Sequence, residues 1–472
     1  MELDTLNNFA EKDPGGGRIK FGPAQILIFG FLGLIAAGTA LLMLPISTTS
    51  RVVTPWLTAL FTSTSAVCVT GLVVENTLAY WSLFGKIVII LCIQIGGLGF
   101  MTLVSMIFVV TGKKISFKNR LLMQEALSFN TTSGVVKFTL LIVKLTLLIE
   151  GIGALCLSFV FVPEYGFVTG IWYSIFHSIS AFCNAGFDLV GNNSLMPYVQ
   201  NEWFSYSIMI LIILGGLGYT VWLDTYNVLK TKSELAEHFT WRQTFYKLSL
   251  HTKLVWIITI VLILGGFIFF FIAEYNNPAT LGSLSFADKI TAAMFQSVSP
   301  RTAGFNTLAL DELTLGSKLM TVMLMFVGGS PAGTAGGIKT VTLGVLVLCA
   351  VSVLKGDSSV VVFKKKISTD QILKSLTIMT IAILIVMIAL TILTFSEDAT
   401  FIELLFETVS AFATVGLTLG ITSSLSFTGK LVIIALMFIG RVGLITVGVA
   451  LIVRAAKNPV GLQYPEEKVL VG

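Results

Sequence analysis

The sequence predicts an all-α membrane protein of four tandem repeats, each a long helix, a short helix with a loop, and a second long helix. Of the 472 residues, 55% are hydrophobic and only 12% are charged, about half the charged share of soluble domains. The apolar residues form eight runs that are long enough to cross a bilayer as helices, which takes about twenty residues. Between alternate pairs of runs lies a shorter, more polar segment that cannot span.

The long and short segments follow one another in a fixed order that repeats four times. The predicted spans are 24–44, 85–111, 138–162, 204–229, 254–274, 318–354, 372–395 and 428–453. The short segments are 54–66, 168–182, 286–299 and 401–413. The resulting division is a flexible cytosolic tail (1–20), repeat 1 (21–125), repeat 2 (126–235), repeat 3 with a broken second helix (236–363), repeat 4 (364–456) and a C-terminal tail (457–472).

Each short segment ends in a loop that contains glycine. Thr-Val-Gly after a short helix is how a potassium-channel filter begins, where backbone carbonyls replace the water shell of an ion. Glycine allows the positive φ angles that turn carbonyls toward a common axis. Four such loops at matching places predict an ion filter around a pseudo-fourfold pore, with K⁺ there as the only bound metal. The filter residues are Val69, Thr70, Gly71, Asn184, Ala185, Gly186, Thr302, Ala303, Gly304, Thr414, Val415 and Gly416.

A glycine motif follows each loop after 24 to 29 residues, inside the second long run. The four motifs are Gly96-Gly97-Leu98-Gly99, Gly215-Gly216-Leu217-Gly218, Gly328-Gly329-Ser330 and Gly440-Arg441-Val442-Gly443. Four aligned copies of a two-part pattern indicate an internal repeat. The alternative is eight ordinary spans with small residues for helix packing. It accounts for the glycines but not for four non-spanning segments that each end in a loop.

Charge predicts the orientation of the chain. Lysine and arginine concentrate in the segments that join the repeats and in both tails, which marks these parts as cytoplasmic. Both termini are therefore expected inside the cell, and the short helices enter from the outer face. Acidic residues gather on that outer side, among them Glu75, Asp188, Glu274, Glu397 and Glu407. Their common sign favours a vestibule that concentrates cations, although any one of them fits a solvated loop equally well.

The second run of repeat 3 contains a stretch that cannot remain helical. Its ten residues are Gly328, Gly329, Ser330, Pro331, Ala332, Gly333, Thr334, Ala335, Gly336 and Gly337. One proline and five glycines break a helix, and irregular backbone at membrane depth must be buried in protein or line water. We predict a gate loop under the filter, with a static kink as the alternative. The stretch half-resembles a phosphate-binding loop, but Ile338 replaces the required glycine and no strand precedes it, so nucleotide binding is rejected.

Two charged residues lie within predicted spans. Arg441 interrupts the last span, and a guanidinium in mid-bilayer must face water or a partner. We predict that it projects into the pore as a barrier to cations; the alternative is an ion pair with a buried carboxylate. Glu150 has no evident partner on its own helix, so it pairs with another helix, is protonated, or holds a coupling ion. Lys339 is expected to reach toward the cytosolic interface.

The remaining reactive residue types show no catalytic arrangement. The three histidines are scattered, and His177 reads as a packing or hydrogen-bonding residue. The five cysteines form no CxxC pair, so neither a disulfide framework nor a zinc site is expected. The sequence therefore predicts no enzyme, no organic cofactor and no nucleic-acid partner.

From about Phe21 onward the chain resembles the Trk/Ktr/HKT superfamily of cation transporters, most closely its KtrB-type membrane subunits. The resemblance rests on Leu44-Pro45-Ile46-Ser47, Ile93-Gln94-Ile95-Gly96-Gly97-Leu98-Gly99-Phe100, Asn184-Ala185-Gly186-Phe187, Pro300-Arg301-Thr302-Ala303-Gly304-Phe305-Asn306 and Met437-Phe438-Ile439-Gly440-Arg441. It implies channel-like potassium uptake across the plasma membrane, a homodimer in lipid with one pore in each subunit, and a cytosolic ring of nucleotide-binding KtrA-type regulatory subunits. In members of the superfamily that prefer sodium, the resemblance implies Ser in place of the glycine of the first filter loop. This chain has Gly71 at that position.

Two other functions stay open from the sequence. One is a sodium-selective or mixed sodium and potassium transporter of the same superfamily. For the potassium subunit itself, Na⁺ is a candidate activator. The other is an alternating-access secondary transporter, whose repeats would normally be inverted. Here all four repeats run in the same direction.

Overall fold

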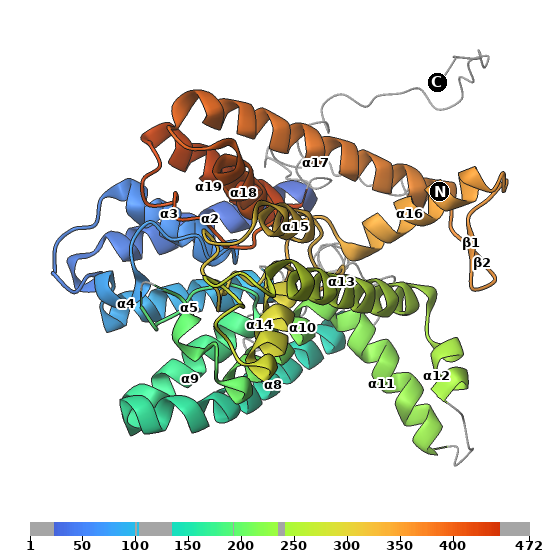
Figure 1. The fold of residues 1–472 in the computed structure, drawn as a ribbon, viewed down its shortest axis with the longest axis horizontal. Coiled ribbons are helices and arrows are strands. Elements are labelled where there is room, and N and C mark those ends of the chain that lie inside the picture. Colours follow the sequence, from blue (N-terminus) through green and yellow to red (C-terminus); the bar gives the residue numbers. More distant parts are fainter. Residues whose placement is uncertain (1–22, 100–101, 103–134, 192, 235–240, 444–472) are drawn as a thin grey trace, which may run out of the picture.

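The computed structural model describes residues 23–99, 102, 135–191, 193–234 and 241–443. Within them the chain is almost entirely helical, and its one sheet is a hairpin of two short strands (Figure 1). The all-α prediction is therefore confirmed. The two predicted tails, 1–20 and 457–472, lie outside the described residues.

The first helix of each repeat is long and apolar enough to span a membrane by length and composition. These four helices are α2 (Pro23–Met43), α8 (Val135–Tyr165), α13 (Leu250–Glu274) and α17 (Thr369–Ser396). The four short helices also lie where the sequence predicts them, within two residues at each end. They are α3 (Trp56–Val67), α9 (Phe167–Phe182), α14 (Phe286–Val298) and α18 (Phe401–Phe412).

In repeats 2 and 3 the second run is divided into two helices, whereas in repeats 1 and 4 its described part is a single helix that ends before Gly99 or Gly443. These helices are α5 (Leu83–Leu98), α10 (Glu202–Leu217), α11 (Tyr219–Glu234), α15 (Leu315–Phe326), α16 (Thr340–Leu354) and α19 (Phe427–Val442). Helices α10 and α11 meet at 94°, so the expected continuous span 204–229 is wrong. Helices α5, α10 and α19 each end at a glycine with positive φ and extended ψ, a combination that glycine tolerates: Gly99, Gly218 and Gly443 have φ of 85°, 87° and 95° and ψ of 142°, 140° and 138°.

Short elements complete the connections. They are η2 (Pro45–Ser47), α4 (Thr77–Tyr80), η3 (Met196–Tyr198), α12 (Trp241–Lys247), β1 (Val361–Val362) and β2 (Lys365–Lys366). Helix α12 and the hairpin belong to segments that join one repeat to the next, and they lie together at one end of the molecule, on the right in Figure 1.

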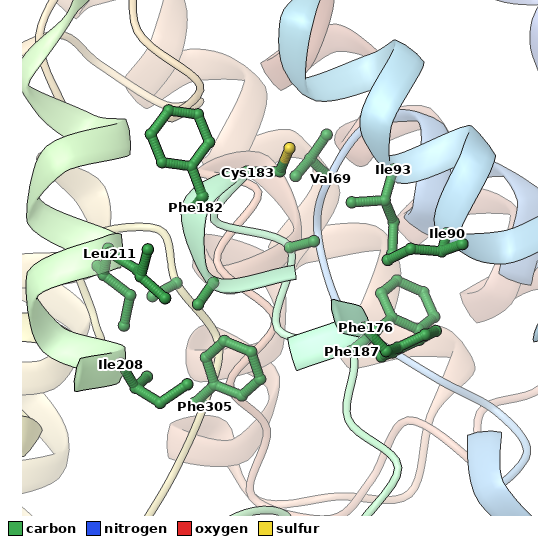
Figure 2. Packing of buried hydrophobic residues seen from close by; sticks show 14 of the residues in the cluster. Val69, Ile90, Ile93, Phe176, Phe182, Cys183, Phe187, Ile208, Leu211 and Phe305 are labelled. Carbon is green, nitrogen blue, oxygen red and sulfur yellow. The ribbon is translucent and has the colours of Figure 1, made fainter. Parts of the chain in front are cut away.

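The four repeats contact one another in a closed cyclic order. The first helix of each repeat packs against its own short helix, and the second helix also contacts the short helix of the next repeat. These cross-repeat contacts are α5 with α9, α10 with α14, α15 with α18, and α19 with α3. The last contact returns from repeat 4 to repeat 1. Two buried apolar clusters support this circle, and Figure 2 shows part of the one between repeats 1, 2 and 3.

A small repeated contact joins the first helix to the short helix in three of the repeats. A serine hydroxyl on the short helix donates to a carbonyl of the first helix, three residues before a glycine that leaves room for the serine. The bonds are Ser63 to Ile35 (2.8 Å), Ser178 to Glu150 (2.6 Å) and Ser297 to Ile263 (2.6 Å). Ile35, Glu150 and Ile263 therefore occupy equivalent positions.

Candidate ion pathway

The four predicted filter loops share one unusual backbone. In each loop the first residue and the glycine two positions later have positive φ, a conformation that is uncommon for residues other than glycine. The first residues are Val69 (57°), Asn184 (59°), Thr302 (73°) and Thr414 (51°). The glycines are Gly71 (92°), Gly186 (69°), Gly304 (80°) and Gly416 (95°). Four loops that differ in sequence thus take the same path.

The loops close into a ring. A Cβ added to Gly71 would overlap the carbonyl oxygen of Ala185 in repeat 2. Gly186 stands in the same relation to Ala303, Gly304 to Val415, and Gly416 to Thr70. The circle passes once through every repeat and returns to the first. No side chain fits between neighbouring loops, which explains why all four positions are glycine.

Each loop is fixed to the end of its own short helix by a serine that the sequence analysis did not single out. The backbone N–H of the middle loop residue donates to the serine carbonyl: Thr70 to Ser65 (2.8 Å), Ala185 to Ser180 (2.7 Å), Ala303 to Ser299 (3.0 Å) and Val415 to Ser410 (2.9 Å). The hydroxyls add further bonds, such as those from the Gly71 and Gly416 N–H groups to Ser65 and Ser410. A serine five or six residues before each glycine is visible in the sequence and could have been found.

The loop carbonyls keep their acceptor capacity. All twelve filter residues are buried, and within the described part of the chain no backbone hydrogen bond of the loops ends on their carbonyl oxygens. Buried carbonyls are nearly always paired with something. The oxygens of Ala185, Ala303, Val415 and Thr70 each lie against the glycine of a neighbouring loop.

A cavity of about 250 Å³ opens above the ring. All four loop glycines line it, together with Glu75 and Asp188. The cavity walls take water away from Asp188, and this desolvation raises the pKa of its carboxyl group to about 6. The Val190 N–H partly offsets the effect by donating to that carboxylate (3.1 Å).

Other outer acidic residues hold the structure together instead. Glu274 accepts from the Thr314 N–H (3.0 Å) where α15 begins, and Glu397 accepts from the Ser426 N–H (2.8 Å) where α19 begins. Glu407 is fully buried and accepts from the hydroxyls of Thr418 (2.7 Å) and Thr422 (2.6 Å). Of the five acidic residues named from the sequence, Glu75 and Asp188 are the two that line this cavity in the described structure, and the negative vestibule stays a prediction.

The second-helix glycines have a packing role. A Cβ on Gly96 would overlap the carbonyl of Val67, the last residue of α3. Gly215 and Gly440 meet the last carbonyls of α9 and α18 in the same way. These three glycines therefore allow the second helices to pack closely on the ends of the short helices.

The predicted gate loop leaves the helix at Val327 and returns at Lys339, between α15 and α16. Its two ends pair with each other, since Gly328 N–H donates to Ile338 (2.9 Å) and Thr340 N–H to Gly329 (3.0 Å). Its middle pairs with the broken second run of repeat 2. There Ser330 N–H donates to Gly216 (2.9 Å), Thr334 N–H to Gly215 (3.2 Å), and Tyr219 N–H to Ala332 (2.9 Å). The loop is thus ordered non-helical backbone.

Arg441 joins this loop to repeat 1. Its guanidinium donates to the carbonyls of Thr334, Gly96 and Gly97, the last at 3.1 Å. In the described residues its partners are carbonyls, and no carboxylate forms an ion pair with it. Lys339 donates to the Ala335 carbonyl (2.6 Å), so its ammonium turns back into the loop instead of reaching toward the cytosolic interface. The positively charged side chains of Arg441 and Lys339 therefore donate to the successive backbone carbonyls of Thr334 and Ala335.

Glu150 and His177 have partners that only the fold reveals. The Gln94 side-chain amide on α5 donates to both carboxylate oxygens of Glu150, at 3.0 and 3.1 Å. His177 contacts the Tyr173 carbonyl through Nδ1 (2.8 Å), and its Nε2 accepts from the Leu189 N–H (3.2 Å). His177 is a buried hydrogen-bonding residue, as the sequence indicates.

These features define a polytopic helical membrane transport protein with loops that converge from four repeats. The family model for TrkH, cation transport protein, matches residues 22–459. The chain belongs to this family, which consists of cation transporters and not of enzymes.

Two relatives are similar over almost their whole length. The potassium/sodium uptake protein NtpJ of Enterococcus hirae is 40% identical over 459 residues, which cover 96% of this chain and 98% of that protein. The Ktr system potassium uptake protein B of Bacillus subtilis is 42% identical over 454 residues, with the same coverage. The solved potassium transporter TrkH from Vibrio parahaemolyticus has a TM-score of 0.71, covering 95% of this chain and 88% of that one. Its 17% identity supports the fold alone.

Proposed function

We propose that the chain is the potassium-translocating, channel-like subunit of a Ktr/Trk-type uptake system. The four loops form a selectivity filter around a pseudo-fourfold axis, and a partly dehydrated K⁺ binds to their carbonyl oxygens. The observation that carries the proposal is the ring of buried carbonyls, in which each loop glycine abuts the next loop. The cavity above it, with Glu75 and Asp188, receives cations from outside.

The gate lies below the filter. The loop Gly328–Gly337 contacts repeats 2 and 4 directly, and Arg441 ties it to the end of α5 in repeat 1. A guanidinium in this position repels a cation that leaves the filter. Opening requires that the bonds from Arg441 to Thr334 and from Ser330 to Gly216 break together.

The gate is tested by shortening the loop. Deletion of Ala332–Ala335 removes the Thr334 carbonyl and is expected to raise K⁺ flux several-fold without changing the K⁺/Na⁺ permeability ratio. Flux through purified protein in liposomes gives both quantities. Unchanged flux in a folded deletion variant would favour the static kink.

Partners and orientation follow the family expectations. We expect a homodimer in the plasma membrane with both termini in the cytoplasm, because lysine and arginine gather between the repeats. Relatives are named as proteins of a Ktr system, which supports a regulatory partner, and we expect it to be a cytosolic nucleotide-binding ring. The exposed lysines of the hairpin, Lys364, Lys365 and Lys366, lie at the end of the molecule that would face it.

A mixed sodium and potassium pathway is the second candidate. The observation that favours it is the name of the Enterococcus hirae relative, a potassium/sodium uptake protein. Reversal potentials in mixed K⁺ and Na⁺ decide between the two functions. A shift that follows K⁺ alone supports the potassium subunit, whereas equal shifts for both ions support the mixed pathway. An alternating-access transporter would instead show slow, saturable flux.

Potassium uptake in a cell that lacks its own uptake systems tests the function as a whole. The wild-type chain, together with a regulatory subunit, is expected to restore growth at low K⁺. An empty vector and a Gly71→Ser variant provide the comparison. Failure of a membrane-inserted wild-type protein to carry K⁺ would contradict the proposal.

A further inference from the structure

Two polar side chains stand at positions where the other repeats have apolar ones. Glu150 is equivalent to Ile35 and Ile263, as the serine contacts of the short helices show. Gln94 lies two residues before Gly96, the glycine that packs on the short helix. The same position in the other repeats holds Ile213, Phe326 and Phe438.

Glu150 and Gln94 are in direct contact with each other. Glu150 is only 5% exposed, and Gln94 from the neighbouring repeat donates to both of its oxygens. A carboxylate in the bilayer interior is costly and is retained mainly where it has a task. In the described residues Glu150 has no cationic partner. The pair therefore replaces an apolar contact between repeats 1 and 2 with a directed polar one.

The pair touches the second filter loop. The Cys183 thiol lies 3.8 Å from the Oε1 atom of the Glu150 carboxylate and 4.0 Å from the side-chain amide oxygen (Oε1) of Gln94. Cys183 caps α9 and directly precedes Asn184, the first filter residue of this loop. Figure 2 shows its side chain among Val69, Phe182 and the α5 residue Ile93.

The other three loops have no such support in the described residues. The residues equivalent to Cys183 are Cys68, Arg301 and Ala413. Ala413 has no polar side chain, and the Arg301 Nε–H has no hydrogen-bond partner. The second loop is thus the one whose leading residue contacts a carboxylate from another helix.

The pair also lies beside the gate. Gly97, three residues after Gln94, would meet the Cys183 thiol with an added Cβ, and its carbonyl accepts from Arg441. The same turn of α5 therefore contacts the filter on one side and the arginine on the other.

We propose that Glu150 and Gln94 act as positioning residues that fix the second filter loop and thereby set the discrimination of the pore between K⁺ and Na⁺. This inference rests on the proposed function. The Ala185 carbonyl, two residues after Cys183, abuts Gly71 of the first loop. A displacement of Cys183 consequently moves one member of the carbonyl ring relative to its neighbour.

The test uses the full-length protein in liposomes and compares Glu150→Gln, Gln94→Glu and the exchange variant with both changes. The wild type is measured first: if it carries no K⁺, the proposed function fails and not this inference. Glu150→Gln leaves two amides facing each other, and Gln94→Glu leaves two carboxyl groups facing each other. For each single change we expect the K⁺/Na⁺ permeability ratio to fall about fivefold, which is a coupling energy typical of residues in contact. The exchange variant restores an acid and an amide and is expected to return within about twofold of the wild type.

Glu202→Gln is the matched control, the same chemical change at an exposed position where α10 begins. Thermal unfolding of each variant separates lost stability from lost selectivity. An unchanged permeability ratio in Glu150→Gln, or an exchange variant no better than the single changes, would overturn the proposal. If Glu150→Gln does not fold, Cys183→Ala decides, because it removes only the thiol contact: a ratio like that of the wild type would again contradict the positioning role.

Discussion

The filter loops and the layer directly beneath them follow opposite rules. In the loops, four different sequences take the same backbone path, with positive φ at matching residues. In the layer beneath, the four repeats differ: α5, α10 and α19 end at glycine, repeat 3 has a thirteen-residue excursion from Val327 to Lys339, and repeat 4 contributes Arg441. The four repeats are alike in the layer of the loops and differ from one another in the layer beneath it.

Contact explains the difference. Each loop glycine abuts the next loop, so a change in one copy disturbs the ring as a whole. Next to the ring lie the loop 328–337 and Arg441, each of which comes from one repeat alone. In the proposed function the uniform layer recognises the ion and the asymmetric layer controls its passage.

The largest expected effect comes from breaking the uniform layer. Gly71→Ser places a side chain against the Ala185 carbonyl at a φ of 92°, which serine rarely adopts. We expect the K⁺/Na⁺ permeability ratio to fall roughly tenfold or more, equivalent to about 1.4 kcal/mol of lost discrimination. Reversal potentials measure it, with Gly33→Ser as the control because nothing lies within 4 Å of that glycine's Cβ position. Equal selectivity in both variants would show that the ring does not discriminate.

A substitution in the layer beneath the loops, where the repeats differ, should change the rate of K⁺ flux and leave the K⁺/Na⁺ selectivity unchanged. Arg441→Ala removes a positive charge and three hydrogen bonds, one to the loop 328–337 and two to the end of α5. We expect K⁺ flux to rise about five- to tenfold, within the range of one charge at a partly screened site, while the permeability ratio stays constant. The matched control is Arg51→Ala, an exposed arginine in the loop before α3. Conductance identical to the wild type would exclude the barrier.

A smaller effect is expected on stability. Gly96→Ala puts a methyl group into the Val67 carbonyl, and overpacking of this kind costs about 1–3 kcal/mol. Gly151→Ala, on a helix surface with nothing within 4 Å, should leave stability unchanged or raise it by up to about 1 kcal/mol. Thermal unfolding in detergent compares the two. Equal loss of stability would mean that α5 and α3 do not rely on this close approach.

The smallest effect concerns external pH. Because the pKa of the Asp188 carboxyl group is raised to about 6, the group is ionised at pH 7.5 and mostly protonated at pH 5. The outer cavity then loses negative charge, and K⁺ uptake at low K⁺ should fall roughly twofold. Asp188→Asn should remove this dependence and keep the lower rate at both values. A pH profile unchanged by the substitution would assign the dependence to another group.

The sequence was sufficient for the upper layer. Short polar segments that end in glycine predict both the short helices and the filter loops, because few other backbones require glycine at matching places in four repeats. The break between α15 and α16 was equally predictable, since proline and five glycines leave no helical alternative. Serines such as Ser65 and Ser410 were missed, although their spacing from the loop glycines repeats.

The lower layer needed the fold. Gly-Gly-Leu-Gly occurs in straight spanning helices as well as at breaks, so the 94° bend at Gly218 was not predictable from these residues. The partners of Arg441 are backbone carbonyls from repeats 1 and 3, which carry no sequence signature. Glu150 and Gln94 are 56 residues apart, and only the packing of α5 against repeat 2 brings them together.

Anomalous diffraction from crystals grown with Rb⁺ or Tl⁺ in place of K⁺ tests the central claim most directly. We predict an anomalous peak on the axis between Gly71, Gly186, Gly304 and Gly416, within bonding distance of the loop carbonyls. An ordered ring with no peak, or with the ion bound at a repeat interface away from it, would contradict the account.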